Sequence, residues 1–279
     1  MEDVKDAARL LEDTYRNSAC FNGYVSIEVL PEFARDPDRT IKSAREIFGQ
    51  IGMPNIMIKV PGTKEAPEAI RALTSEGINV NATLLFSLKH YEACAKAYIE
   101  GLKDRLGDKK DIKNVFSVAS VFVSRIDTKI DDVLECAGTE RMKGKAAVAN
   151  SKMIYRRFKE IFKAGDFPIL LQKGANPQRV LWASTSTKNP AYSDLKYVEE
   201  LIGPDTINTM PPQTVKAFLD HGKPELRLEN GLDEARSDLA ELERLGIDID
   251  GISSEIQAAG VIAFQNSFDK LIQSIEQKM

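Results

Sequence analysis

NIMIKVP (residues 55–61) is the stretch that decides the fold, because it is a short apolar run with a lysine near its middle. Ile56, Ile58 and Val60 alternate with polar or flexible side chains, as expected for a β-strand whose side chains point to opposite faces. An amine removed from water loses several kcal/mol of hydration unless it meets an anion or gives up its proton. The position of Lys59 therefore needs a chemical explanation.

Five further runs have the composition of strands, and segments of helical periodicity lie between them. In residues 38–52, apolar side chains recur every three or four residues, which is typical of a helix that buries one face. Strands that alternate with helices predict a parallel α/β sheet, either open and doubly wound or closed into a barrel. The six candidate strands are residues 23–29, 55–61, 78–86, 115–125, 179–185 and 206–210.

Three more helices are expected between these strands, at residues 66–77, 87–102 and 144–162. From about Leu232 onward the pattern is helical only, and we expect an extra pair of helices packed on the outside. The sequence shows no linker, low-complexity tract or internal repeat. The simplest interpretation is one domain over residues 1–279 with a helical tail from about residue 232.

The bulk composition limits the classes of partner. The formal net charge is −4 and the isoelectric point is about 5.5, which argues against a general affinity for nucleic acid or an anionic membrane. A local basic site for a phosphorylated metabolite stays compatible with that charge. No apolar run approaches the roughly 18 residues that a membrane span needs, and residues 1–17 form a charged amphipathic pattern rather than a signal peptide.

The number and spacing of the cysteines and histidines argue against a metal site. Cys20, Cys94 and Cys136 are too few and too far apart for a disulfide framework or a zinc cluster, and they suggest a reducing compartment. His90 and His221 are the only two histidines of the sequence, which disfavours a histidine-rich metal site. We expect a cytoplasmic protein without a metal site.

Polar residues share one parity on the predicted strands. If the opposite, apolar faces pack on helices, the polar faces of a barrel meet in one interior, where the carboxyl ends of the strands form an active site. Lys59 would then share a polar mouth with Glu28, Asn81, Thr83 and Ser120, and Ser184 adds a hydroxyl on a later strand.

A lysine in such a mouth is useful as a nucleophile. A neutral amine attacks a carbonyl to form a Schiff base, and the protonated imine then allows the adjacent carbon–carbon bond to break or form. Desolvation favours the neutral form, and Glu28 is the nearby candidate for moving protons. The alternative is that Lys59 reaches solvent from an edge strand or forms an ordinary ion pair.

Six ordered motifs together resemble the transaldolase family, in its longer bacterial branch. They are GYVSIEV (23–29), IMIKVPGT (56–63), EGINVNATLLFS (76–87), VASVFVSRID (118–127), WASTSTKNPAYSD (182–194) and DTINTMPPQT (205–214). The resemblance implies a TIM-type (β/α)₈ barrel of the class I aldolase kind, with no metal or organic cofactor. It implies Schiff-base transfer of a dihydroxyacetone unit between sugar phosphates in the non-oxidative pentose phosphate pathway. Sedoheptulose 7-phosphate and glyceraldehyde 3-phosphate would give erythrose 4-phosphate and fructose 6-phosphate.

The resemblance also implies roles for residues at the matching positions. Lys59 corresponds to the Schiff-base lysine and Glu28 to the catalytic glutamate. Asn81 and Thr83 correspond to residues that hold the carbinolamine and its water, and Ser120 to a further serine of the site.

Three other residues correspond to substrate contacts of the family. Arg125 matches the phosphate-binding arginine, and its alternative is a surface ion pair. Ser184 matches a substrate-contacting serine, and Lys188 is a candidate for a second phosphate charge. Phe122 either walls the site or fills the core, whereas Trp182 has the opposite parity and is expected in the core facing the helices.

One departure from the family pattern leaves alternatives open. Lys59 lies on the second strand here, whereas the family places its lysine on the fourth. We therefore expect the family's first two strands, with an aspartate that assists proton transfer, to be absent, which corresponds to about 60 residues or more. A six-stranded arc would have two unpaired edges, which self-association is one way to cover. The alternative functions are a truncated, weakly active or non-catalytic sugar-phosphate-binding remnant, or a simple Schiff-base aldolase.

Overall fold

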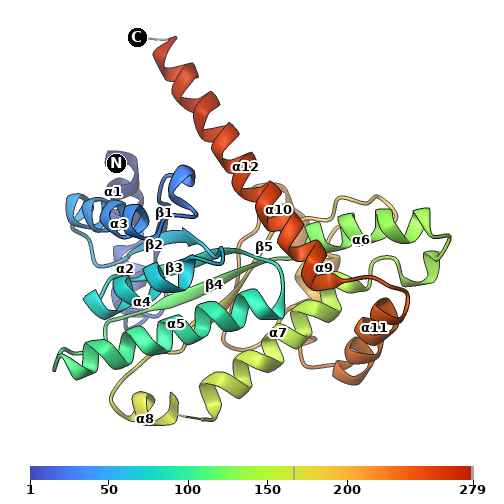
Figure 1. Cartoon of the computed structure of the whole chain (residues 1–279), viewed down its shortest axis with the longest axis horizontal. Helices are drawn as coiled ribbons and strands as arrows, with labels where there is room; N and C mark the ends of the chain where they lie inside the picture. Colours follow the sequence, from blue (N-terminus) through green and yellow to red (C-terminus); the bar gives the residue numbers. More distant parts are fainter. Residues whose placement is uncertain (166, 278–279) are drawn as a thin grey trace.

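The computed structural model describes residues 1–165 and 167–277, and a six-stranded parallel sheet lies at its centre (Figure 1). Each strand pairs with the next strand along the chain, in the order β1-β2-β3-β4-β5-β6. All six predicted strands are confirmed. Their bounds are β1 (Val25–Glu28), β2 (Ile56–Pro61), β3 (Val80–Leu85), β4 (Ser117–Phe122), β5 (Arg179–Ala183) and β6 (Thr206–Asn208).

Helices fill the connections, and those predicted at residues 38–52, 66–77, 87–102 and 144–162 are confirmed as α3, α4, α5 and α7. Two short 3₁₀ turns are η1 (Pro31–Phe33) and η2 (Glu140–Met142). The helices are α1 (Glu2–Leu10), α2 (Glu12–Asn17), α3 (Pro37–Ile51), α4 (Ala66–Glu76), α5 (Leu88–Gly107), α6 (Ser124–Cys136), α7 (Ala146–Lys163), α8 (Phe167–Gln172), α9 (Lys196–Glu199), α10 (Pro212–His221), α11 (Leu232–Arg244) and α12 (Ile249–Glu276).

Local capping sets the ends of the helices that follow β1 and β3. The Asp36 carboxylate accepts a hydrogen bond from the backbone N–H of Arg39 and so caps α3, which ends at Gly52 with a left-handed φ of 66°. The Ser87 hydroxyl accepts from the N–H of His90 at the start of α5. Each helix therefore begins a few residues after its strand and returns the chain to the other end of the sheet.

Apolar and polar side chains lie on opposite faces of the sheet, as the alternation predicts. Ile56, Ile58 and Val60 are almost fully buried, and the helices beyond them contact one another in turn, α3 with α4, α4 with α5 and α5 with α7. The opposite face of β2 carries Lys59, which is opposite Glu28 on β1 and Asn81 on β3 in the strand register. The polar side chains therefore share the face that the helices leave free.

The sheet is an open arc of a parallel barrel. In the described part of the chain, β1 pairs only with β2 and β6 only with β5. At the amino end of the strands, Arg179 from β5 donates a hydrogen bond to the carbonyl of Phe21 and stacks on its ring at 3.9 Å. This contact joins the segment before β1 to β5 across the hollow of the arc.

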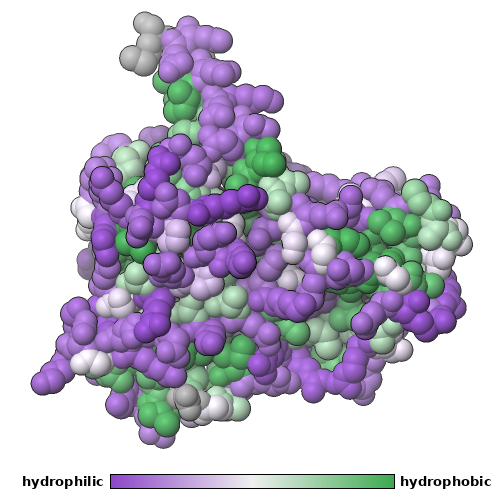
Figure 2. Space-filling view, viewed as in Figure 1, coloured by the Kyte–Doolittle hydropathy of each residue, from purple (hydrophilic) through white to green (hydrophobic). Residues whose placement is uncertain are grey.

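The two C-terminal helices behave differently from each other. As expected, α11 packs on the outside, against α7. The same expectation is wrong for the first half of α12, where Gln257 donates to the carbonyl oxygens of Gly62 (2.8 Å) and Leu84 (2.9 Å) at the carboxyl ends of β2 and β3. The C-terminal turns of α12 project away from the body (Figure 1), and Figure 2 shows both hydrophobic and hydrophilic residues on them.

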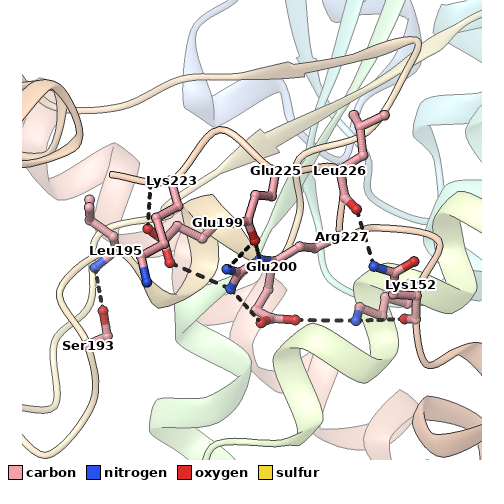
Figure 3. Close-up of polar contacts among 10 residues, drawn as sticks. Lys152, Ser193, Leu195, Glu199, Glu200, Lys223, Glu225, Leu226 and Arg227 are labelled. Atoms are coloured by element: carbon pink, nitrogen blue, oxygen red, sulfur yellow. Dashed lines mark hydrogen bonds and ion pairs between the residues drawn. The ribbon is translucent and has the colours of Figure 1, made fainter. Parts of the chain in front are cut away.

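A network of ion pairs holds the chain between β6 and α11 against α7 (Figure 3). Glu200 accepts from the Lys152 amine at 3.3 Å and lies 3.6 Å from the Arg227 guanidinium. Lys152 also donates to the carbonyl of Asn230 at 2.9 Å, so this largely buried cation is satisfied by α9 and by the segment that leads into α11. None of the helices within residues 1–165 and 167–277 is long and apolar enough to cross a membrane.

Candidate active site

The concave face of the sheet encloses a cavity of about 440 Å³. Side chains from all the strands β1 to β6, or from the residues beside them, contribute to its lining, and most of them have the parity of Lys59 on their own strands. Two larger hollows lie elsewhere, between α4 and α5 and beside α11 and α12. In the first of these, Arg71 and Asp104 pair with each other at 2.6 Å. The cavity lining comprises Asn22, Gly23, Tyr24, Ser26, Met57, Lys59, Asn81, Val118, Ser120, Arg179, Leu181, Ala183, Ile207 and Thr209.

Lys59, which lines this cavity, lies opposite Glu28 on the neighbouring strand β1. The Lys59 Nζ lies 3.8 Å from Glu28 Oε2, and the two side chains are 25% and 19% exposed. Burial raises the pKa of the Glu28 carboxyl, and the nearby charge of Lys59 opposes that rise only in part. The distance is too long for a direct hydrogen bond but lies within ion-pair range, so the ion pair given above as the alternative for Lys59 is present in this structure.

A chain of hydrogen bonds fixes the amide of Asn81 beside Lys59. Ser120 donates to Asn81 Oδ1 at 2.7 Å, and Asn81 Nδ2 donates to the Ser26 hydroxyl at 3.0 Å. These three residues come from β4, β3 and β1, so they tie three strands together across the cavity. The orientation of the Asn81 amide is therefore set by both of its neighbours.

Two buried polar atoms next to this chain lack a partner within the described structure. They are Oε1 of Glu28 and the hydroxyl of Thr83, which is fully buried. Buried polar groups in native proteins are nearly always hydrogen-bonded, to protein, water or ligand. Both atoms therefore keep unused hydrogen-bonding capacity beside the site.

Arg125 and Ser184 lie together at the carboxyl ends of β4 and β5. α6 begins directly after β4, and its Ser124 hydroxyl is 3.1 Å from that of Ser184, whose backbone has a strained φ of 56°. The Arg125 guanidinium lies 5.3 Å from the ring of Phe122. Among the described residues it has no carboxylate within ion-pair distance, which leaves its charge free for an anion. The predicted alternative of a surface ion pair is not observed there.

Lys188 is not brought together with the other predicted residues. Its side chain is exposed and lines a separate hollow of about 200 Å³ that is rich in acidic groups, including Asp127 and Asp131. Asp131 accepts a hydrogen bond from Tyr192 at 2.6 Å, so the segment that carries Lys188 is held against α6. Phe122 is buried against Phe86, with ring centroids 5.4 Å apart, and belongs mainly to the core.

Sequence reasoning gave no role to two residues at this site. Arg179 lines the cavity from the amino end of β5. It has the same parity as Leu181 and Ala183, and this parity could have placed it on the cavity face. Phe264, on α12, has its ring centroid 6.0 Å from the Lys59 Nζ. No local pattern links α12 to β2, so the sequence offered no comparable signal for Phe264. Trp182 is fully buried in the core, as predicted.

The chain is similar to known proteins over almost its whole length. A family model described as transaldolase/fructose-6-phosphate aldolase matches residues 1–275. A protein named transaldolase from Thiobacillus denitrificans is 45% identical over 276 residues, which cover 98% of this chain and 77% of the relative. Transaldolase 2 of Nostoc punctiforme is 43% identical over 291 residues, covering 99% of this chain and 76% of the relative. The chain therefore belongs to the transaldolase/fructose-6-phosphate aldolase family.

Proposed function

We propose that the chain is a transaldolase in which Lys59 is the nucleophile, and the position of its amine 3.8 Å from Glu28 at the sheet cavity is the observation that carries the proposal. The amine adds to the ketone carbonyl of fructose 6-phosphate, and loss of water gives a protonated imine. The bond between C3 and C4 breaks as the C4 hydroxyl loses its proton, so that glyceraldehyde 3-phosphate leaves. The three-carbon enamine left on Lys59 then adds to the aldehyde of erythrose 4-phosphate. Hydrolysis of the resulting imine releases sedoheptulose 7-phosphate.

Glu28 is the group that moves protons in these steps, acting through one water molecule. Its raised pKa keeps it closer to the working pH than an ordinary glutamate, which suits an acid–base group. Thr83 donates or accepts a hydrogen bond at the same water, because its buried hydroxyl has no other partner in the described structure. Asn81, fixed by Ser120, holds the carbinolamine oxygen.

The phosphate of the substrate binds at the start of α6. Arg125 supplies a guanidinium that has no carboxylate partner among the described residues, and its planar fork matches a phosphate. Ser184 and Ser124 add hydroxyl groups, and the N-terminus of a 13-residue helix favours an anion. Lys188 lines a separate hollow, so Arg125 is the charge that the proposal assigns to the phosphate.

The proposal includes a cellular setting and partners. Sugar phosphates are the ligands, whereas nucleic acid and membranes are not. The unpaired Cys20, Cys94 and Cys136 suit a reducing compartment such as the cytoplasm. The unpaired edges of β1 and β6 in the described sheet give a reason for self-association.

Borohydride reduction in the presence of fructose 6-phosphate tests the nucleophile. We expect a stable three-carbon adduct on the peptide that contains Lys59, and its loss in Lys59→Met. The matched control is Lys64→Met, which removes an exposed lysine just beyond the same strand and should keep the adduct. An adduct on another lysine, or one that persists in Lys59→Met, contradicts the proposal.

Product analysis separates this activity from a simple Schiff-base aldolase. A transaldolase converts fructose 6-phosphate only slowly until erythrose 4-phosphate is added, and then forms sedoheptulose 7-phosphate. An aldolase releases free dihydroxyacetone at the same rate with or without that acceptor. A remnant that only binds sugar phosphate gives neither product.

A further inference from the structure

Phe264 is the closest described aromatic contact of the Lys59 amine, although the two residues lie on elements that are far apart in the sequence. Its ring centroid is 6.0 Å from the Lys59 Nζ, and the side chain packs partly buried against the core. A cation–π attraction is weak at that distance. The main effect of the ring is therefore to occupy space beside the amine that water would otherwise fill.

Hydrogen bonds to the carboxyl ends of β2 and β3 hold α12 at the site. Gln257, which is 9% exposed, donates to the carbonyl oxygens of Gly62 and Leu84, so α12 satisfies groups that end β2 and interrupt β3. Leu84 itself has φ of 58° at a shift in the β3–β4 register. This deformation is costly for a bulky residue, and it presents the Leu84 carbonyl to the helix.

Gly260 lets the same helix face approach closely. A Cβ atom at Gly260 would lie 3.3 Å from Leu84 Cδ2 and 3.7 Å from Arg125 Nη1. Residues three, four and seven apart share a face of a helix, so Gln257, Gly260 and Phe264 lie on one face of α12. One helix face thus contacts the strand ends, the phosphate-binding arginine and the catalytic amine.

We propose that α12 is a wall of the active site and that Phe264 shields the Lys59 adduct from water, which makes it a specificity-determining residue. The inference rests on the proposed function of Lys59. In the transfer reaction, the enamine on Lys59 adds to an acceptor aldehyde. In the competing reaction, the enamine takes a proton at carbon to give an imine, one water adds to that imine, and dihydroxyacetone leaves with the free amine restored. A ring beside the adduct slows the second path and leaves the first open.

The test measures how the Lys59 adduct divides between these two paths. With fructose 6-phosphate and erythrose 4-phosphate, free dihydroxyacetone is measured relative to sedoheptulose 7-phosphate. We expect Phe264→Ala to raise this ratio about tenfold or more, equivalent to about 1.4 kcal/mol in favour of hydrolysis. Phe264→Leu, which keeps part of the apolar bulk, should give an intermediate ratio, and Gln257→Met, which releases the helix from the strand ends, should raise it with Phe264 present.

The matched control is Ile262→Ala, which removes an apolar side chain that is 60% exposed on the same helix and should leave the ratio unchanged. If Phe264→Ala does not fold, Phe264→Leu supplies the same comparison. A wild-type ratio in the folded Phe264 variants, with the borohydride adduct still formed on Lys59, overturns the shielding role alone. Failure to trap Lys59 in the wild-type protein overturns the proposed function instead.

Discussion

Asn81 and Ser120 are joined by a hydrogen bond across β3 and β4, with the Ser120 hydroxyl 2.7 Å from Asn81 Oδ1. Because this bond fixes which end of the amide faces Lys59, Ser120→Ala should lower kcat/KM by about tenfold, the effect of one hydrogen bond worth about 1.4 kcal/mol. The control is Ser117→Ala on the same strand, whose hydroxyl donates to the Val80 carbonyl and accepts from Gln178 Nε2. That variant should lose stability but keep the kcat/KM of the folded enzyme. Equal kinetic losses in both variants would contradict an orienting role.

The pH dependence of the reaction should follow the ionisation of Glu28. Burial raises the pKa of this carboxyl above its ordinary value of 4.5, so the ionised base is lost at a higher pH than in an exposed glutamate. The acid limb of the kcat/KM profile should therefore have its midpoint above 4.5. Glu28→Gln should remove that limb and lower activity by about 10²- to 10⁴-fold, whereas Glu32→Gln, at an exposed position in η1, should do neither. A limb that persists in Glu28→Gln assigns the base elsewhere.

Recognition of phosphate should depend on Arg125. Charge-assisted hydrogen bonds contribute about 1.5–3 kcal/mol, so Arg125→Ala should raise KM for fructose 6-phosphate roughly 10- to 150-fold. Unphosphorylated dihydroxyacetone as donor should be affected far less. Lys129→Ala, one turn further along α6 at an exposed site, is the control. If both donors lose activity equally in Arg125→Ala, the residue is structural.

The stability of the fold should depend on pH through Asp127. Burial raises the pKa of this carboxyl from 3.8 to about 6, although Ala147 N–H and the Tyr197 hydroxyl both donate to it. A raised pKa in the folded state stabilises the protein fully below the unfolded value, and that contribution is lost as the pH rises to about 6. Asp127→Asn does not titrate. Its free energy of unfolding relative to wild type should therefore rise by about 2 kcal/mol between about pH 4.5 and about pH 7.5.

Urea unfolding at several pH values measures this difference. The matched control is Asp132→Asn on the same helix, where the side chain is exposed and no such trend is expected. A constant difference between Asp127→Asn and wild type across this range would show that Asp127 titrates as an ordinary surface carboxyl.

The strands and the central pair could be predicted because they follow from local patterns. The alternation around Lys59 gave its strand and its face, and the register then places Glu28 opposite it, as the shared parity indicated. Arg125 could be placed next to the end of β4 for the same reason, since a residue just beyond a strand cannot lie far from it. The proposed chemical roles of these residues await the experiments above.

The rest of the site depends on contacts that sequence patterns do not encode. Lys188 is only four residues beyond Ser184, which suggested that both line the same site. The hydrogen bond between Tyr192 and Asp131 instead holds the segment of Lys188 against α6. Phe264 reaches Lys59 only because Gln257 docks α12 on the ends of β2 and β3. The amphipathic pattern of α12 indicated a helix but not the surface that it covers.

The pairing of each strand with its immediate successor has a consequence for how the sheet assembles. Contacts between neighbouring strand–helix units are short in sequence, so the sheet can grow from β1 toward β6 while the chain is still being synthesised. The contact of Arg179 with Phe21 is an exception, because it joins residues 158 apart. It closes a loop that includes most of the sheet and cannot form until β5 has been made. The curvature of the growing arc is thus fixed late, when Arg179 is made and reaches the segment of Phe21 that was synthesised long before it.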